Sequence, residues 1–299
     1  ACRTIESRSS RLITILITPF MSCSARIPIY LLLAGTFFAA NAGSVMLGLY
    51  VLGIVLAVVT ARLMRRFLFP VDETPFVMEL PPYRLPTWKT TLTHMWDKCA
   101  QYLKKMGGMI LIASVVVWFL SYYPRTEETA GTEAHYENSY LGRLGKGCEP
   151  VFSPLGFNWK ASVALLSGLP AKEIVVSTLG VLYSEGAMTE AVPEQAEIII
   201  GGADGPTEIV VAAEKAAAPE LTEDEEMASL SQRLLASGDF STASALAFLV
   251  FILLYVPCIA TVVAIGAEAG WKWAAASVVY NTALAWFVAW IVYRIALVF

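Results

Sequence analysis

The feature that most constrains this fold is a series of apolar stretches, each near the length needed to cross a bilayer. A helix takes roughly 20 apolar residues to span the hydrocarbon layer. The stretches that approach this length are 12–40, 43–61, 107–123, 161–183, 242–267 and 273–298. The composition agrees, because 57% of the residues are hydrophobic and only 15% are charged. The sequence therefore predicts an all-α, polytopic helical membrane protein with about six spans.

Two of these stretches contain a break that combines proline with cysteine. The first is TPFMSCSARIPIY at 18–30, and the second is LLYVPCIATVVAIG at 253–266. Proline removes a backbone donor and disfavours helical angles in the residue before it. Unwound backbone at membrane depth is tolerated only inside protein or beside water, and transporters use such breaks as ion sites. We therefore predict an ion pathway at these breaks. The residues predicted to line it are Pro19, Ser22, Ser24, Arg26, Pro28, Lys172, Pro257 and Thr261.

The thiols in the breaks indicate which ion such a site would favour. Cys23 lies in the first break and Cys258 directly follows Pro257 in the second. Thiolate sulfur is a soft ligand that favours transition metals over sodium. The alternative is that each cysteine is a small residue in helix packing, and this is our interpretation of Cys2, Cys99 and Cys148. The sequence contains no CxxC motif, so it suggests neither a disulfide framework nor a zinc finger.

Charged residues also enter an apolar stretch in SGLPAKEIVVSTLGVLY, 167–183. Lys172 and Glu173 are adjacent, so on a helix their side chains point about 100° apart and each needs its own partner. Arg26 should find a carboxylate or carbonyl, and Glu173 is one candidate. Alternatively, Lys172 extends to the membrane interface and Glu173 simply begins a helix.

The distribution of arginine and lysine predicts the organisation of the chain. We expect a first gate region at 1–68, a cytoplasmic or interfacial connector at 69–106, and spans at 107–184 with an external loop at 124–160. An acidic, flexible insertion at 185–241 follows, with a small hairpin at 197–211. A second gate region occupies 242–299 with two spans.

Several chemistries have no support in the sequence. No GxxxxGK[ST] motif is present, so we expect this chain to bind no nucleotide in that way. His94 and His135 lie outside the spans, and neither a Ser-His-Asp nor an HExxH arrangement can be assembled. No basic stripe with interleaved aromatics points to nucleic acid. We therefore expect no catalytic residues and no enzymatic activity.

Four segments carry a resemblance to a known family. They are ACRTIESRSSRLITILITPFMSCSARIPIY, PFVMELPPYRLPTWK, SGLPAKEIVVSTLGVLY and YVPCIATVVAI. Together they resemble the membrane part of the ferrous iron transport protein B family. The resemblance implies Fe(II) uptake across the bacterial inner membrane, with Fe(II) as the transported ion. It also implies that Cys23 and Cys258 are gate cysteines that contact the metal, and that Glu173 belongs to the AKE motif of the family and is a further metal ligand.

The resemblance also implies partners. They are membrane lipid, the N-terminal GTP-binding and first membrane segments that this sequence lacks, small accessory iron-transport proteins, and further copies of the chain in a homo-oligomer. The acidic insertion is longer than the family pattern suggests, and its GGADGPT resembles a stretch in sodium-pumping decarboxylase subunits. The alternatives are therefore an ion-coupled carrier or sodium-pump membrane subunit, and a non-transporting truncated fragment.

Overall fold

The computed structural model describes residue 5 and residues 7–68, 87–124, 137–183 and 223–298. Throughout these ranges the regular secondary structure is helical, without a strand, which confirms the all-α prediction. The predictions for Cys2, His135 and the hairpin at 197–211 fall outside the described residues.

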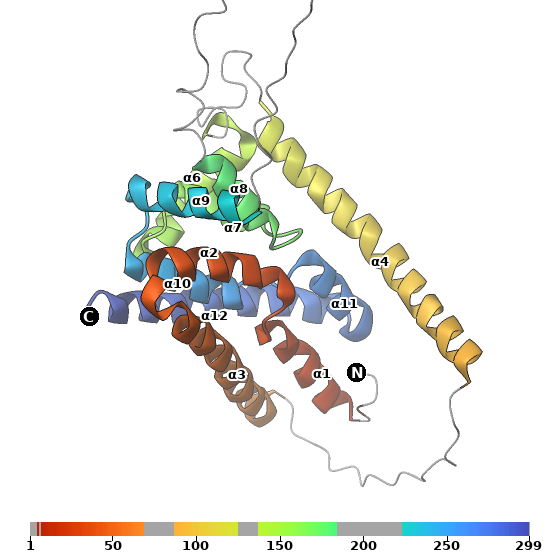
Figure 1. The fold of residues 1–299 in the computed structure, drawn as a ribbon. Coiled ribbons are helices and arrows are strands. Elements are labelled where there is room, and N and C mark those ends of the chain that lie inside the picture. The colour runs from red at the N-terminus through yellow and green to blue at the C-terminus, as the bar shows by residue number, and fades with distance from the viewer. Residues whose placement is uncertain (1–4, 6, 69–86, 125–136, 184–222, 299) are drawn as a thin grey trace, which may run out of the picture.

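Long apolar helices dominate the fold (Figure 1). Within the described ranges, 4 helical stretches are long and apolar enough to cross a membrane: Arg8–Phe37, Ala39–Phe67, Thr242–Ala269 and Trp271–Ala296. A shorter apolar stretch, Gly107–Tyr122, forms the second half of a longer helix. The polytopic membrane architecture is thus confirmed.

The helices follow one another in this order: α1 (Arg8–Ile17), α2 (Ile27–Phe37), α3 (Ala42–Phe67), α4 (Trp88–Tyr122), α6 (Tyr140–Phe152), α7 (Trp159–Ser167), α8 (Ile174–Leu182), α9 (Glu223–Ser237), α10 (Thr242–Leu254), α11 (Ile259–Ala269) and α12 (Trp271–Ala296). Short 3₁₀ turns connect some of them: η2 (Thr18–Phe20), η3 (Ser24–Arg26), η4 (Ala39–Asn41) and η6 (Ser153–Leu155).

Helix α10 is the centre of the molecule. From Ala243 to Leu254 every residue except Leu246 is buried, as expected for a helix that is apolar on all sides. It packs against α12, α2 and α3. In Figure 1, α10 and α12 cross the middle of the body, with α6 to α9 on one side and α1 and α3 on the other.

Both breaks predicted from proline and cysteine are present. The first separates α1 from α2 and the second separates α10 from α11. Each broken pair is followed by an unbroken helix of 26 residues, α3 in one case and α12 in the other. The two long helices are joined where the hydroxyls of Thr60 and Tyr280 lie 2.8 Å apart. Phe20, from the first break, meets the Tyr280 ring edge-on at 6.2 Å between centroids.

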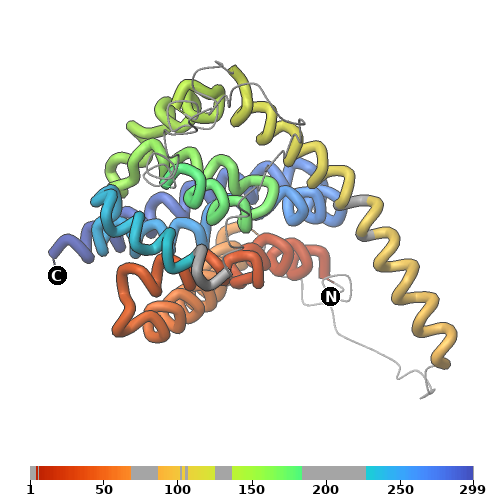
Figure 2. The backbone as a smooth tube through the Cα atoms, turned by 45° about the horizontal axis from the view of Figure 1, so that its top comes forward, coloured from red at the N-terminus to blue at the C-terminus, as the bar shows by residue number. Residues whose placement is uncertain are grey.

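Four expectations about the middle of the chain need correction. The stretch 161–183 is not one continuous span, because the chain unwinds between α7 and α8. The described end of the connector and the span beyond it form a single helix, α4, which extends along one edge of the body and contacts α6 and α11 (Figure 2). The expected loop at 124–160 contains α6. The last part of the expected flexible insertion is α9, which packs on α2 with Leu230 and Leu234 buried.

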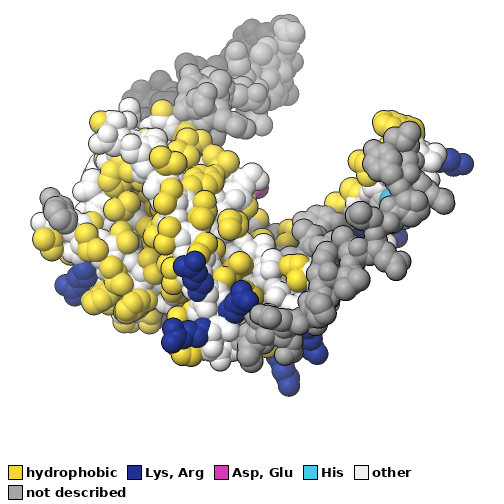
Figure 3. Space-filling view, turned by 90° about the horizontal axis from the view of Figure 1, so that it is seen from below, with side chains coloured by type: hydrophobic (Ala, Val, Ile, Leu, Met, Phe, Trp, Pro, Cys, Tyr) yellow, Lys and Arg dark blue, Asp and Glu magenta, His cyan; other side chains and the backbone are white. Residues whose placement is uncertain are grey.

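The outside of the helical body is apolar, as lipid contact requires. Figure 3 shows hydrophobic side chains spread over one face, with Lys and Arg gathered near its margin. Helix α3 exposes Val51, Ile54 and Val58 along its length, and exposed Arg65 and Arg66 lie in its last turn. Cationic side chains at the end of an apolar helix suit both the interface and the helix dipole.

Gly53 tests how tightly α3 packs on the first break. A Cβ at Gly53 would lie 2.9 Å from the Phe20 carbonyl oxygen, which is backbone and cannot turn aside. We expect Gly53→Ala to destabilise the protein by about 1–3 kcal/mol, a typical cost of overpacking. Gly48→Ala, on the same helix with no neighbour within 4 Å, is the matched control. Thermal unfolding in detergent measures both, and equal melting temperatures would contradict this packing.

Candidate ion site at the helix breaks

Arg26 organises the first break. Its guanidinium is 3% exposed and donates from Nη1 to the Met21 carbonyl at 3.1 Å and from Nη2 to the Pro19 carbonyl at 3.0 Å. The break frees these carbonyls from helical pairing, and a planar guanidinium can reach two acceptors at once. Of the two partners predicted for Arg26, a carboxylate or a carbonyl, the structure shows carbonyls.

The other residues of the first break differ in their exposure. Pro19 is buried within η2, and Pro28 stands in the first turn of α2, where its missing N–H costs nothing. Cys23 and Ser24 are exposed. Ser22 is partly buried. A thiol and a hydroxyl of this break are thus accessible from outside.

The second break has a similar composition but is deeper. Tyr255 and Pro257 are buried, and Cys258 is partly buried. The Cys258 sulfur lies 3.2 Å from the Thr261 hydroxyl, and the Cys258 carbonyl accepts from the N–H groups of Thr261 and Val262 at the start of α11. Cys258 and Thr261, both predicted from sequence, therefore form one local group.

A third break, between α7 and α8, lies against the second. The Ile259 N–H donates to the Leu169 carbonyl at 3.2 Å, a direct backbone link between the two unwound segments. A Cβ on Gly168 would lie 2.9 Å from the Tyr255 hydroxyl, so a glycine here lets Tyr255 approach the third break. Pro170 is buried in the same segment.

Lys172 projects from the third break into the protein interior. It is 3% exposed and donates to the Ile252 carbonyl at 3.0 Å, near the C-terminal end of α10. Its Nζ also lies 4.1 Å from the centre of the Tyr255 ring. The alternative in which Lys172 extends to the membrane interface is therefore wrong.

Glu173 has a different position from its neighbour. It is exposed and occupies the N-cap position of α8, which matches the alternative in which it begins a helix. Among the described residues it forms no ion pair with Arg26, whose side-chain hydrogen bonds go to carbonyls instead. The predicted Arg26–Glu173 pair is thus absent from the described residues, and Arg26 has the carbonyl partners that the sequence analysis also allowed.

The three breaks share one electrostatic neighbourhood. Lys172 lies within electrostatic reach of Arg26, Cys23 and Cys258. Two buried tyrosines complete the group, since Tyr30 interacts with Arg26 and Cys23, and Tyr255 with Arg26 and Cys258. Among the described residues, the Tyr255 hydroxyl and Nε of Arg26 are buried without a hydrogen-bond partner. Sequence reasoning gave Tyr30 no role, although a phenol inside an apolar stretch next to a break was a usable signal.

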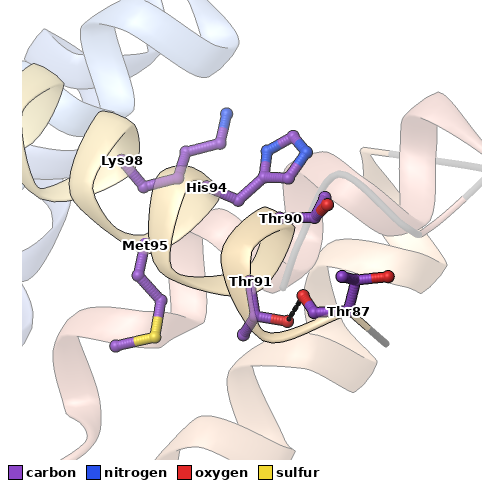
Figure 4. A pocket seen from close by; sticks show the side chains of 6 residues that line it. All are labelled: Thr87, Thr90, Thr91, His94, Met95 and Lys98. Carbon is purple, nitrogen blue, oxygen red and sulfur yellow. Dashed lines mark hydrogen bonds between the residues drawn. The ribbon is translucent and has the colours of Figure 1, made fainter. Parts of the chain in front are cut away.

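Other parts of the described chain are weaker candidates for an ion site. A hollow of about 630 Å³ follows the first turns of α4 and is lined by Thr87, Thr90, Thr91, His94, Met95 and Lys98 (Figure 4). All of these residues come from one face of one exposed helix, so the hollow is open surface. In the described ranges, no three His, Cys, Asp or Glu side chains come together as a metal cluster. The described side chains and backbone of the breaks offer carbonyl oxygens and the hydroxyls of Ser22, Ser24 and Thr261 beside the thiols.

Comparison with known proteins identifies the family to which this chain belongs. The family model described as ferrous iron transport protein B C terminus matches residues 46–98, across α3 and the start of α4. The Gate family model, described as nucleoside recognition, matches residues 103–272, more than half of the chain, and includes the second and third breaks. The chain belongs to the ferrous iron transport protein B family. It corresponds to the C-terminal membrane part.

Curated FeoB relatives match nearly the whole chain. An Fe(2+) transport protein A/Fe(2+) transporter FeoB fusion protein from Porphyromonas gingivalis is 48% identical over 100% of this chain and 36% of its own length. The Fe(2+) transporter FeoB of Campylobacter jejuni is 36% identical over 90% of this chain and 39% of its own length. That of Methanocaldococcus jannaschii is 37% identical over 98% and 38%. The chain thus spans about two fifths of the length of these FeoB relatives. No solved structure matches the fold.

The role of Arg26 in this FeoB segment can be tested by stability. Replacing it by methionine leaves the Pro19 and Met21 carbonyls without their donor, at a cost of about 1–3 kcal/mol for each buried acceptor. We expect Arg26→Met to lower the melting temperature in detergent by several degrees, and Arg26→Lys to lower it less. Arg62→Met removes an exposed arginine from α3 and is the matched control. An unchanged melting temperature in Arg26→Met would exclude a structural role for the guanidinium.

Proposed function

We propose that this chain is the membrane-permease part of a GTP-dependent Fe(II) transporter in the bacterial inner membrane. The observation that carries the proposal is the meeting of three helix breaks around two thiols, in a chain whose curated relatives are named Fe(2+) transporters. The GTP-binding part belongs to the remaining three fifths of such proteins. Iron is the cargo in this proposal, and the chain's own residues form its path.

The chemistry of the breaks favours a transition metal over an alkali ion. In our proposal the sulfurs of Cys23 and Cys258 are soft contacts for Fe(II), and freed carbonyls and the Thr261 hydroxyl supply oxygen. Glu173, exposed at the start of α8, is proposed as a carboxylate contact for the arriving ion. Soft sulfur discriminates against sodium, for which carbonyl and carboxylate oxygens alone would serve.

The site must also let the ion leave. Conduction requires binding that is strong enough for entry and weak enough for release. Few protein ligands and two nearby cations, Arg26 and Lys172, both reduce the affinity for a dication. We infer that Fe(II) contacts the breaks transiently and keeps part of its water shell.

Cysteine variants test the assignment of the thiols. In a full-length transporter that carries this chain as its C-terminal part, we expect Cys23→Ser and Cys258→Ser each to reduce Fe(II) uptake at least about tenfold, the usual scale for weakened metal sites. Cys99→Ser and Cys148→Ser, which lie outside the breaks, are the matched controls. Uptake of radioactive iron into cells, normalised to the membrane-inserted protein, gives the comparison.

Two results would contradict the proposal. Unchanged uptake in both break variants would remove the thiols from the iron path. Transport that requires sodium and ignores Fe(II) would point instead to an ion-coupled carrier.

A further inference from the structure

The position of Lys172 is built from groups that attract cations. Its ammonium donates to the Ile252 carbonyl at 3.0 Å, close to the end of α10, where helical carbonyls are no longer all paired and the helix dipole is negative. It stands 4.1 Å from the centre of the Tyr255 ring, whose π face also favours positive charge. Both thiols of the breaks are within its electrostatic reach.

Stability does not explain this lysine. It is 3% exposed, and within the described chain no carboxylate forms a salt bridge with it. The remaining charged group within its reach, Arg26, repels it. An apolar side chain of similar volume would avoid the cost of removing an ammonium from water. Lys172 therefore occupies a place suited to a cation, although burying its ammonium costs free energy that an apolar side chain would not.

We propose that Lys172 is a tethered cation that fills the ion position between the breaks while no metal is bound, so that Fe(II) enters only when the ammonium withdraws. This inference rests on the proposed transport function and deepens it. Lys172 is then a positioning residue that acts by competition. Since the competitor is attached to the chain, its effective concentration at the site is high.

This arrangement has two consequences for the transported ion. A monovalent ion gains little by displacing a group of equal charge from the same carbonyl and ring. Fe(II) has twice the charge and can also bind the thiols, so it gains interaction free energy at the site that the ammonium cannot. Return of the ammonium then opposes rebinding and favours release.

Protection of the thiols by iron measures this competition. The chain is placed in lipid nanodiscs with Cys2, Cys99 and Cys148 replaced by serine, so that only Cys23 and Cys258 react. The rate of maleimide labelling is followed anaerobically against Fe(II) concentration. We expect Lys172→Met to reach half-protection at an Fe(II) concentration at least about tenfold below that of the parent, because a like charge has been removed. Lys172→Arg, which keeps the charge, should stay near the parent.

Variants at Tyr255 provide a second test that does not depend on whether the Lys172→Met variant folds. Tyr255→Leu removes the π face and should lower the half-protection concentration about threefold or more, because the ammonium is held less firmly. Tyr255→Phe keeps the face and should match the parent. Lys160→Met is the charge control, because Lys160 also lies over aromatic rings, those of Trp159 and Tyr183, but at the opposite end of α7.

Each outcome bears on the proposal. Half-protection that is unchanged or higher in both Lys172→Met and Tyr255→Leu, with the parent protected by Fe(II), overturns the tethered cation and leaves the transport proposal intact. Absence of protection in the parent and in every variant overturns the ferrous site, and the tethered cation with it.

Discussion

The structure depends on how a membrane-embedded chain satisfies backbone carbonyls and N–H groups that its helices leave unpaired. Lipid offers these groups no partner, so each interruption needs an internal one. The first break uses the two arms of Arg26, the end of α10 uses the Lys172 ammonium, and the start of α11 uses the Leu169 carbonyl. Cations and backbone from one segment thus complete another, which explains why positive charge lies where a positive ion is proposed to pass.

Much of this arrangement could be predicted from the sequence. Proline in the same short segment as cysteine located the first and second breaks, because proline acts locally on the helix that contains it. The cost of a buried guanidinium likewise predicted a carboxylate or carbonyl partner for Arg26, and the structure shows carbonyls. The identity of the family followed from long exact segments, which the comparisons bear out.

What could not be predicted depends on contacts distant in sequence. The 161–183 stretch is apolar enough for a span although it contains Pro170, and the contacts that hold its unwound part are distant in sequence: Leu169 pairs with Ile259, and Lys172 reaches Ile252. The placement of Tyr255 over Lys172 also joins residues that are far apart along the chain. Local signals could not decide between an interfacial and an interior Lys172, since both suit a lysine in the same short motif.

The contact between α3 and α12 affects how firmly the two broken halves of the molecule are joined. Each of these 26-residue helices follows a broken pair, and the Thr60–Tyr280 hydroxyl contact joins them across the molecule. Two neutral hydroxyls can separate and exchange partners without stranding a charge in the membrane. The Thr60–Tyr280 contact can therefore open and re-form at little electrostatic cost, so at this point the two broken halves are held together by a reversible hydrogen bond.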